Sequence, residues 1–380
     1  MARVSNASRS LLQRAREVNR EIARVCAAVA GELRTPAGKC CRAALGDRLR
    51  ELEALRPKLR RLRRDIQSTL ADGPGNDAPA RQSNLAPGER VALRRVLGGL
   101  NLGLRKWAPV IACLRQQASG PPLALYAGRA SRRDIDAAQL AVSDEVFLIL
   151  HRIANPADQH ELARAHGCYP DIPMRPSEFL EHAHAAYRVA IAQRRAVPVR
   201  FLDVGCGGGV KVLLAAGFFG RADGLEYDPA YARAARGLFS AAGADSCTVI
   251  EGDALSFGNY RDYDVVYFFK PMSDPEKLAA LEERVVSGVR PGTILVAPYH
   301  HFLGRSSELG CARVVGSIYL ASTPQAAADD VRAAAERVGA ARPRRARAPA
   351  DCGFWQPVVD AARANGFEPF EEELTAVSRR

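Results

Sequence analysis

The sequence predicts an α/β protein in which a doubly wound, mostly parallel sheet is preceded by an Arg-rich, all-helical N-terminal region. Three observations lead to this fold class. From Pro198 onward, short apolar runs alternate with helix-like segments, as they do in such a sheet. The first of these runs passes into a glycine-rich turn at 201–209, FLDVGCGGG. In the first 120 residues, by contrast, apolar residues recur every three or four positions.

The N-terminal region should begin with two long amphipathic helices. Their apolar stripes run through residues 8–34 and 45–70, with the spacing of a helical hairpin or a coiled-coil seam. Pro57 falls inside the second stripe, so we expect it to kink this helix or to split it in two. Residues 71–88 then have the Gly- and Pro-rich composition of a linker.

A third helical region should run from about residue 89 to 117, broken near three glycines between positions 98 and 103. We therefore expect a first, hairpin-like domain at residues 1–120, and a helical connector at 121–197. The connector should contain a helix at 134–153, whose inward-facing residues include Val142, Val146 and Ile153.

Positive charge is concentrated in the N-terminal region. The net charge is +12, and residues 1–120 hold 24 Lys and Arg against 10 Asp and Glu. A basic region of this kind suits contact with a nucleic acid or a protein partner, while the coiled-coil-like stripes suit a homo-oligomer. A bias in composition is the alternative explanation, because only 6 of the 54 basic residues are lysine.

The remaining composition predicts a cytoplasmic protein. Nine cysteines without a Cys-x-x-Cys pair, in a chain without a secretory signal, indicate reduced thiols rather than disulfides. The sequence has no run of 18 apolar residues, so no membrane contact is expected. The histidines and the cysteine between His151 and Cys168 match no standard metal-binding pattern, and we expect no metal site.

The glycine-rich turn is the strongest functional signal. Asp203 closes the strand, and Gly205, Gly207 and Gly209 leave the turn free of side chains, so that its backbone can lie against a bound nucleoside. A dinucleotide-binding fingerprint would need a glycine where this chain has Val210. The pattern D-x-G-x-G-x-G resembles instead motif I of the class I S-adenosylmethionine (SAM) dependent methyltransferases.

Two further positions agree with this resemblance. Glu226, which lies 21 residues after Gly205, resembles the motif II acid that holds the ribose of SAM. Asp253, in EGDAL, resembles the motif III acid at the adenine, and Asp203 resembles the acid that orients the methionyl amino end. The resemblance implies a Rossmann-like fold, SAM as cofactor, and cofactor contacts from Asp203, Gly205, Cys206, Gly207, Gly209, Glu226, Tyr227, Asp253, Ala254 and Phe268.

The elements of this second domain follow in order. Five strands are expected at 199–204, 222–227, 248–251, 264–269 and 293–298, with helices between them. Ser273 and Glu276 have the spacing of a capping box at the start of the helix after the fourth strand. The elements expected after residue 300 are a strand at 312–321, helices at 324–338 and 355–365, and a last edge strand at 367–374. The domain should span residues 198–380, with its core at 198–300.

The methyl acceptor should lie at the end of the fourth strand, where this family contacts its substrate. The expected substrate-binding residues are Phe269, Lys270 and Pro271. The Asn/Asp-Pro-Pro-Tyr/Phe signature of enzymes that methylate planar amino nitrogens is absent, which argues against base N-methylation. We assign no catalytic residue; His300 and His301, just after the fifth strand, are weak candidates for a general base.

The sequence thus predicts a SAM-dependent methyltransferase that moves a methyl group to an unidentified acceptor by in-line displacement. RNA, protein and small molecules all remain open as the acceptor. One alternative is a non-catalytic binding module of the same fold that holds SAM or another adenosine ligand. A less favoured alternative is an NAD-dependent oxidoreductase, against which Val210 argues.

Overall fold

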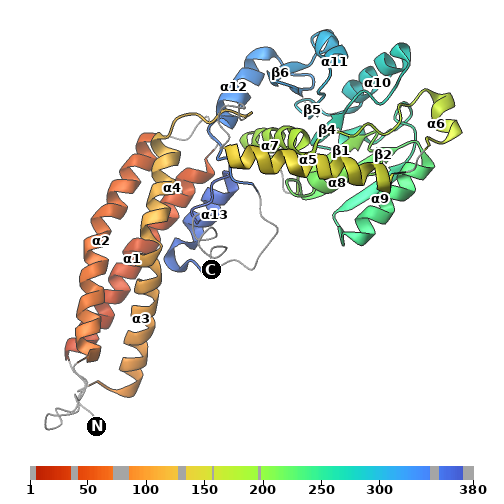
Figure 1. Ribbon diagram of the computed structural model, residues 1–380. Helices are drawn as coiled ribbons and strands as arrows, with labels where there is room; N and C mark the ends of the chain where they lie inside the picture. The colour runs from red at the N-terminus through yellow and green to blue at the C-terminus, as the bar shows by residue number, and fades with distance from the viewer. Residues whose placement is uncertain are drawn as a thin grey trace. The chain divides into compact units, whose positions relative to one another are not determined.

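The computed structural model describes residues 6–35, 42–71, 85–126, 134–155, 158–195, 198–342 and 351–370 (Figure 1). The chain divides into two compact units. The helical unit comprises residues 1–121 together with 346–380, and the sheet unit comprises residues 122–345. In the described ranges, no helix has both the length and the apolar character needed to cross a membrane.

The helical unit contains the helices α1 (Asn6–Arg34), α2 (Arg42–Ala71), α3 (Pro87–Arg105), α4 (Trp107–Ser119) and α13 (Gln356–Ala364). The two long helices expected from the apolar stripes are confirmed as α1 and α2. Helix α2 continues through Pro57, because Leu55 and Leu59 on either side of it are buried and their packing offsets the missing hydrogen bond. The third helical region breaks at Lys106 rather than at a glycine, since Pro109 has no N–H with which to continue α3.

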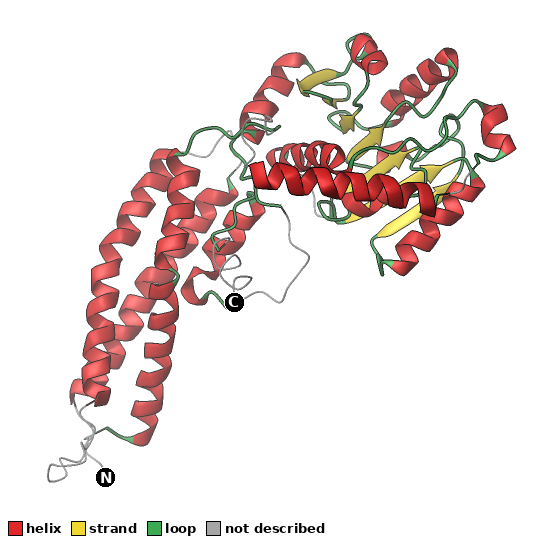
Figure 2. Ribbon diagram, viewed as in Figure 1, coloured by secondary structure: helices red, strands yellow, loops and turns green. Residues whose placement is uncertain are grey.

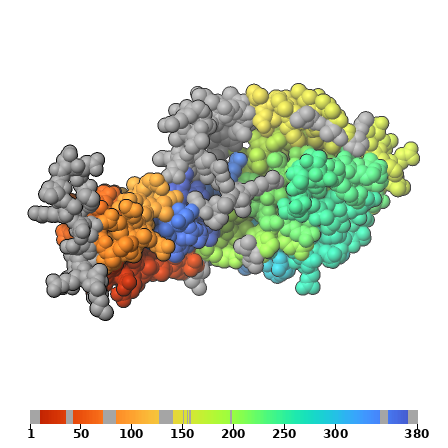
Figure 3. Space-filling view, turned by 90° about the horizontal axis from the view of Figure 1, so that it is seen from below, coloured from red at the N-terminus to blue at the C-terminus, as the bar shows by residue number. Residues whose placement is uncertain are grey.

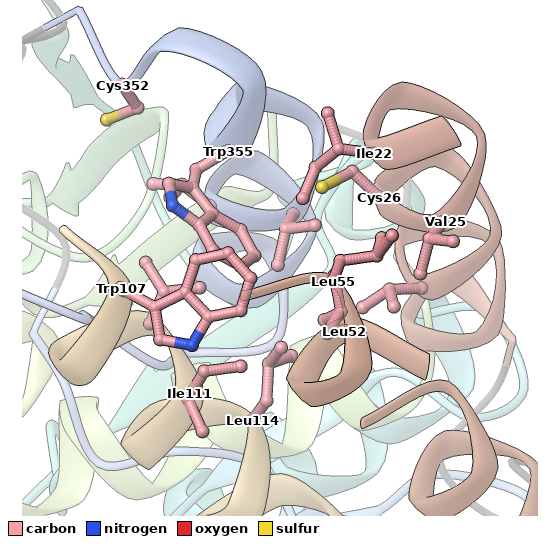
Figure 4. Close-up of a cluster of buried hydrophobic side chains, with 14 of the residues drawn as sticks. Ile22, Val25, Cys26, Leu52, Leu55, Trp107, Ile111, Leu114, Cys352 and Trp355 are labelled. Carbon is pink, nitrogen blue, oxygen red and sulfur yellow. The ribbon is translucent and has the colours of Figure 1, made fainter. Parts of the chain in front are cut away.

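Two tryptophans pack the C-terminal segment, residues 351–370, against α3 and α4 within the helical unit (Figure 4). The buried Trp355, in the short helix η3 (Gly353–Trp355), meets Trp107 edge to face with ring centroids 5.0 Å apart. Its Nε1–H donates to Gly103 O at 2.9 Å. This packing places α13 in the helical unit, so the domain expected to reach residue 380 ends at 345 instead. Residues 367–370 do not form the expected edge strand, and 371–374 lie outside the described residues.

The described part of the sheet unit holds a seven-stranded sheet with the order β3-β2-β1-β4-β5-β7-β6 (Figure 2). Its strands are β1 (Arg200–Val204), β2 (Arg221–Glu226), β3 (Cys247–Glu251), β4 (Val265–Phe268), β5 (Ile294–Val296), β6 (Ala312–Val315) and β7 (Ile318–Leu320). Strands β1 to β5 are parallel and confirm the five expected strands. The single strand expected at 312–321 is an antiparallel hairpin instead, because Gly316, at φ 55°, turns the chain. This order is the class I methyltransferase topology.

Helices cover both faces of this sheet. The helices of the unit are α5 (Asp134–Ala154), α6 (Glu161–His166), α7 (Pro176–Ala192), α8 (Val210–Ala215), α9 (Pro229–Ala241), α10 (Pro275–Gly288), α11 (His300–Arg305) and α12 (Gln325–Ala335). Helices α7, α8, α9 and α12 share a core with Phe201, while α10 and α11 share one with Leu202 on the opposite face. Helix α10 is capped by Asp274 rather than by Ser273 of the expected capping box. Ser273 Oγ instead donates to the backbone carbonyl of Gly167.

Helix α5 lies at the surface of the sheet unit (yellow in Figure 3). The expectation that Val142, Val146 and Ile153 face inward is wrong, because these side chains are 64%, 50% and 76% exposed. Among the residues of α5 whose burial is described, the buried one is polar. Asp144 is buried, and its carboxylate accepts hydrogen bonds from the N–H and Oγ of Ser177 at the start of α7. Its role is to cap a neighbouring helix.

Candidate functional site

The glycine-rich turn follows β1 and is tied to the neighbouring strand β2. Gly205, Gly207 and Gly209 have φ angles of 75°, 56° and 83°, which residues with side chains rarely adopt. Gly205 N–H donates to Leu225 O at 2.8 Å, and Gly207 N–H donates to Glu226 Oε2 at 2.7 Å. The glycine turn and the acid at the end of the second strand are therefore in direct contact.

Glu226 is the last residue of β2 and is buried. Its Oε1 accepts Asp228 N–H at 2.9 Å, while Oε2 is held by Gly207. Burial raises the pKa of Glu226 to about 7, although the two backbone N–H groups oppose this change. Each carboxylate oxygen keeps a lone pair, so Glu226 can accept further hydrogen bonds from a ligand hydroxyl.

Asp203 lies at the end of β1 without a hydrogen-bond donor among the described residues. Both of its carboxylate oxygens are buried, and the ammonium of Lys211, on α8, lies 3.7 Å from Oδ2. Burial raises the pKa of Asp203 to about 7, against the opposing charge of Lys211. A buried carboxylate that lacks donors is suited to a cationic ligand group.

A histidine lies between the two residues expected at the adenine. His166, at the end of α6, stacks on Tyr227 with ring centroids 4.3 Å apart. Its Nε2 lies 3.2 Å from Asp253 Oδ1, which also accepts Leu255 N–H at 2.9 Å. The aromatic ring that follows β2 and the acid that follows β3 are thus close enough to contact one planar group between them.

The strap, residues 167–175, joins α6 to α7 and lies against the ends of β1 and β4. Tyr169 N–H donates to Pro271 O at 3.0 Å, and Ser273 N–H donates to Gly167 O at 2.8 Å. A backbone bridge also pairs Cys168 with Met272. The strap therefore forms one wall of the space at the carboxyl ends of the strands.

Asp171 ties this strap to the glycine turn. Its Oδ2 accepts Gly208 N–H at 2.9 Å and Asn155 Nδ2–H at 2.6 Å, and lies 3.2 Å from His151 Nε2. Burial alone would raise the pKa of Asp171, but the His151 hydrogen bond, the charge of Lys211 and the Gly208 N–H lower it to about 2. Asp171 is therefore ionised at neutral pH.

The turn, the strap and the strand ends enclose a pocket. It holds about 650 Å³ of space not filled by protein atoms, part of it open to solvent. The sequence-predicted residues that line it are Gly205, Gly207, Glu226, Tyr227, Asp253, Ala254, Phe269, Lys270 and Pro271. At the β4 end, Lys270 Nζ lies 5.0 Å from the centre of the Tyr169 ring. The structure thus brings nine of the residues expected for cofactor and substrate into one pocket.

Four of the expected cofactor residues do not line this pocket. Phe268 belongs to the core of the opposite sheet face, where its ring meets that of Phe302 at 5.0 Å. Gly209 lets the turn pack closely against α9, because an added Cβ at this position would lie 2.8 Å from Ala235. Cys206 is buried in the core beneath the turn, and Asp203 is buried and does not line the pocket.

The two histidines proposed as weak general-base candidates lie elsewhere. His301 Nδ1 is 2.8 Å from Glu282 Oε1, and Arg305 and Tyr299 also donate to this buried carboxylate. Neither His300 nor His301 lines the pocket. Glu282 thus holds His301 in a structural network of α10 and α11. Among the described residues, no group of three or more His, Cys, Asp or Glu is arranged to hold a metal ion.

Sequence reasoning missed Lys211 and the strap. Lys211 is the charged residue in the otherwise apolar helix VKVLLA, directly after the turn, and this isolated charge is a usable signal. Tyr169 and Asp171 lie in a Pro-rich stretch without periodicity. Tertiary contacts, such as that between Asp171 and Gly208, show that the strap belongs to the site.

A protein family described as "Methyltransferase domain" matches residues 201–292, which include the glycine turn, Glu226 and Asp253. Residues 201–292 are a methyltransferase domain. The match confirms the family resemblance and the enzyme class expected from the sequence, and the sheet topology agrees with it. Among curated proteins, no sequence matches this chain.

Several solved methyltransferase structures are similar to part of this chain. An RNA methyltransferase from Salinibacter ruber, in complex with S-adenosyl-L-homocysteine, is 25% identical over 33% of this chain and 76% of its own, with a TM-score of 0.28. A SAM-bound amino pentose methyltransferase from Micromonospora echinaspora is 23% identical over 35% of this chain and 59% of its own, with a TM-score of 0.27. A SAM-dependent methyltransferase from Clostridium acetobutylicum is 15% identical over 44% and 61%, with a TM-score of 0.29. The match spans less than two thirds of the latter two chains.

Proposed function

We propose that the methyltransferase domain binds SAM in the pocket beside the glycine turn and transfers its methyl group to an acceptor at the end of β4. The contact between Gly207 N–H and Glu226 Oε2, at 2.7 Å, carries this proposal. It joins the two elements that must act together, because the turn has to lie against the nucleoside while the acid holds its ribose.

The residues present fit SAM, which combines an adenosine, a sulfonium and a methionyl ammonium group. Asp203 has two buried carboxylate oxygens without donors among the described residues, and these suit an ammonium group. Gly205 keeps the pocket wall free, since an added Cβ would lie 2.9 Å from Pro271. Glu226 and Asp253 supply acceptors at the ends of two neighbouring strands.

Each part of SAM can then be assigned to residues of this chain that would bind it. Glu226 accepts from the ribose hydroxyls, and Asp253 and the backbone of Ala254 hold the adenine edge. Asp203, which is buried and does not line the pocket, orients the methionyl amino end through water beside Gly205. When bound, SAM supplies a methyl group activated by its sulfonium. The chain itself holds the donor, orients the acceptor and excludes water. Such alignment can supply about 7–11 kcal/mol of the barrier without a catalytic acid.

The acceptor is expected to lie against Phe269, Lys270 and Pro271. Phe269 is half-buried, and its ring meets Tyr299 edge to face at 6.3 Å. An aromatic wall of this kind accommodates an apolar or planar acceptor, and its low polarity favours an amine in the neutral form that can attack. We assign no general base, because neither His300 nor His301 lines the pocket.

Calorimetric titration with SAM tests the proposal. Glu226→Gln should weaken binding by about tenfold or more, because hydrogen bonds to a charged acceptor contribute about 1.5–3 kcal/mol. Glu251→Gln is the matched control. Glu251 ends β3, pairs with Arg236 at the surface and does not line the pocket, so this variant should bind SAM as the parent does. Parent-like SAM affinity in Glu226→Gln would refute the proposal.

Two further measurements address the alternatives. Release of S-adenosylhomocysteine that requires an added acceptor fraction establishes transfer. SAM binding without that product in any acceptor fraction would establish a non-catalytic binding module instead. Titration with NAD tests the alternative that the protein is an NAD-dependent oxidoreductase. Tighter binding of NAD than of SAM would favour that alternative.

A further inference from the structure

The helical unit carries a groove lined by arginines. The groove lies between α2 and the junction of α3 with α4, and it holds about 1940 Å³ of space not filled by protein atoms, part of it open to solvent. The arginines that line it are Arg56, Arg60, Arg61, Arg63, Arg64, Arg105 and Arg115. Glu53 is the acid among its described lining residues, and it is paired with Arg115. The groove is therefore strongly cationic.

The other six arginines have no acidic partner within the described part of the chain. In addition, the Nε atoms of Arg56 and Arg63 are buried without an acceptor there. A guanidinium stays charged at physiological pH, and a buried N–H without an acceptor costs free energy. An anionic ligand would satisfy these groups and reduce the repulsion between them.

The arginines are spaced for a chain of anions. Arg56, Arg60 and Arg64 follow one another at intervals of four residues on α2, so they recur about every 6 Å along the groove. A nucleic-acid strand carries one phosphate per nucleotide and can meet such a row in succession. The planar fork of arginine binds a phosphate through two parallel hydrogen bonds.

Among its described lining residues, the groove offers no exposed ring on which bases would stack. Trp107 is the aromatic residue among its described lining residues, but it is only 1% exposed, and the Arg56 guanidinium lies 6.0 Å from the centre of its ring. Binding would therefore use phosphates without reading the base sequence. A walled groove also suits one strand better than a duplex, whose phosphates lie on a broad convex surface.

We propose that the helical unit binds single-stranded nucleic acid through its phosphates, in the groove between α2, α3 and α4. The inference is independent of methyl transfer and of the identity of the acceptor. The test is fluorescence anisotropy with the full chain and a labelled strand of about 20 nucleotides. RNA and DNA of the same mixed sequence should both bind, and their affinity should fall as salt rises, because counterions are released.

A triple variant locates the binding. Arg60, Arg64 and Arg105 are exposed and make no ion pair within the described residues, so replacing all three by Gln should leave the fold intact. We expect affinity at low salt to fall by about tenfold or more, and the slope of log affinity against log salt to decrease by about 2, since each phosphate contact contributes about 0.7 on a single strand. Parent-like affinity would overturn the proposal.

The matched control removes the same number of positive charges at positions outside the groove. Arg16, Arg24 and Arg34 are exposed on α1 and do not line the groove. Replacing these three by Gln should alter the affinity by less than about twofold, because phosphate contacts are short-ranged at moderate salt. Equal losses in both triple variants would assign the binding to overall charge and overturn the proposed groove. Thermal melting by circular dichroism verifies that both variants fold.

Competitors identify the class of ligand. A duplex of the same sequence and polyglutamate, at equal concentrations of charge, should displace the labelled strand less effectively than the unlabelled strand does. Tighter binding of the duplex would overturn the assignment to a single strand. Displacement by polyglutamate at the level of the strand would overturn the assignment to nucleic acid and favour an acidic protein partner.

Discussion

Lys211 Nζ lies 3.7 Å from Asp203 Oδ2, in a pair whose side chains are 14% and 0% exposed. Burial penalises the charged carboxylate more than the neighbouring ammonium stabilises it, so the pKa of Asp203 rises to about 7. A cationic ligand group at Asp203 favours the ionised carboxylate. Binding of SAM should therefore be coupled to the protonation of this residue.

The first prediction is that affinity for SAM rises with pH from about 6 to about 8. Below about 7 Asp203 retains a proton that SAM must displace, whereas above that pH the carboxylate is already ionised. Burial also raises the pKa of Glu226 to about 7. If its carboxylate holds the ribose, ionisation of Glu226 strengthens SAM binding over the same pH range. Calorimetry across this range measures the change, and buffers of different ionisation enthalpy report the released proton. A falling affinity would contradict the role given to Asp203.

Lys211→Met should move the midpoint of this pH dependence upward. The ammonium of Lys211 lowers the pKa of Asp203, so its removal leaves the effect of burial less opposed. Lys211→Arg keeps the charge and is the control, with a midpoint close to that of the parent. The same calorimetric series on the three proteins checks the prediction. A downward shift in Lys211→Met would show that the two side chains are not coupled as their distance indicates.

The strand-end residues of the pocket could be predicted from the sequence because parallel strands end at one edge of a sheet. The glycine turn and Glu226 follow from spacing along the chain. The rule that parallel strands end at one edge does not predict which face of the sheet a side chain lies on. Phe269 lines the pocket, whereas its neighbour Phe268 lies in the opposite core, because side chains alternate along a strand.

Contacts between distant segments could not be predicted. Asp171 reaches Gly208 from a position 37 residues earlier, in a stretch that has no helical or strand periodicity. In the helical unit, the apolar pattern of α13 predicts a helix but does not tell which core the helix joins. The hydrogen bond from Trp355 to Gly103 spans 252 residues and decides that question. The local sequence pattern determines which helices and strands form, whereas the fit between side chains determines which of these elements pack together.

Gly207→Ala should disrupt the pocket. Gly207 has φ 56°, and an added Cβ would lie 2.1 Å from Asp171 Cγ. Strain of this kind costs about 1–3 kcal/mol, and the contact would push the strap away from the turn. We expect a lower melting temperature and weaker SAM binding, measured by calorimetry.

The control for this variant is Gly237→Ala. Gly237 lies within α9, and an added Cβ would meet nothing within 4 Å. Alanine is the better helix former, so this variant should be more stable by about 0.5–1 kcal/mol and should bind SAM normally. Parent-like stability and binding in Gly207→Ala would show that the turn does not require glycine.

Trp355→Phe should destabilise the helical unit more than Trp107→Phe does. Both rings are buried and in contact, but Trp355 Nε1–H donates to Gly103 O at 2.9 Å, whereas Trp107 donates no side-chain hydrogen bond within the described residues. Losing the donor leaves a buried carbonyl unsatisfied, which costs about 1–3 kcal/mol beyond the loss of ring volume that both variants share.

Intrinsic fluorescence makes this comparison direct. The chain has two tryptophans, and both belong to the helical unit, so each variant keeps one reporter of the unfolding of that unit. Urea unfolding followed by this fluorescence should give a lower midpoint for Trp355→Phe than for Trp107→Phe. An equal or higher midpoint for Trp355→Phe would mean that the hydrogen bond to Gly103 contributes nothing to holding η3 against α3, and that ring packing alone anchors the C-terminal segment.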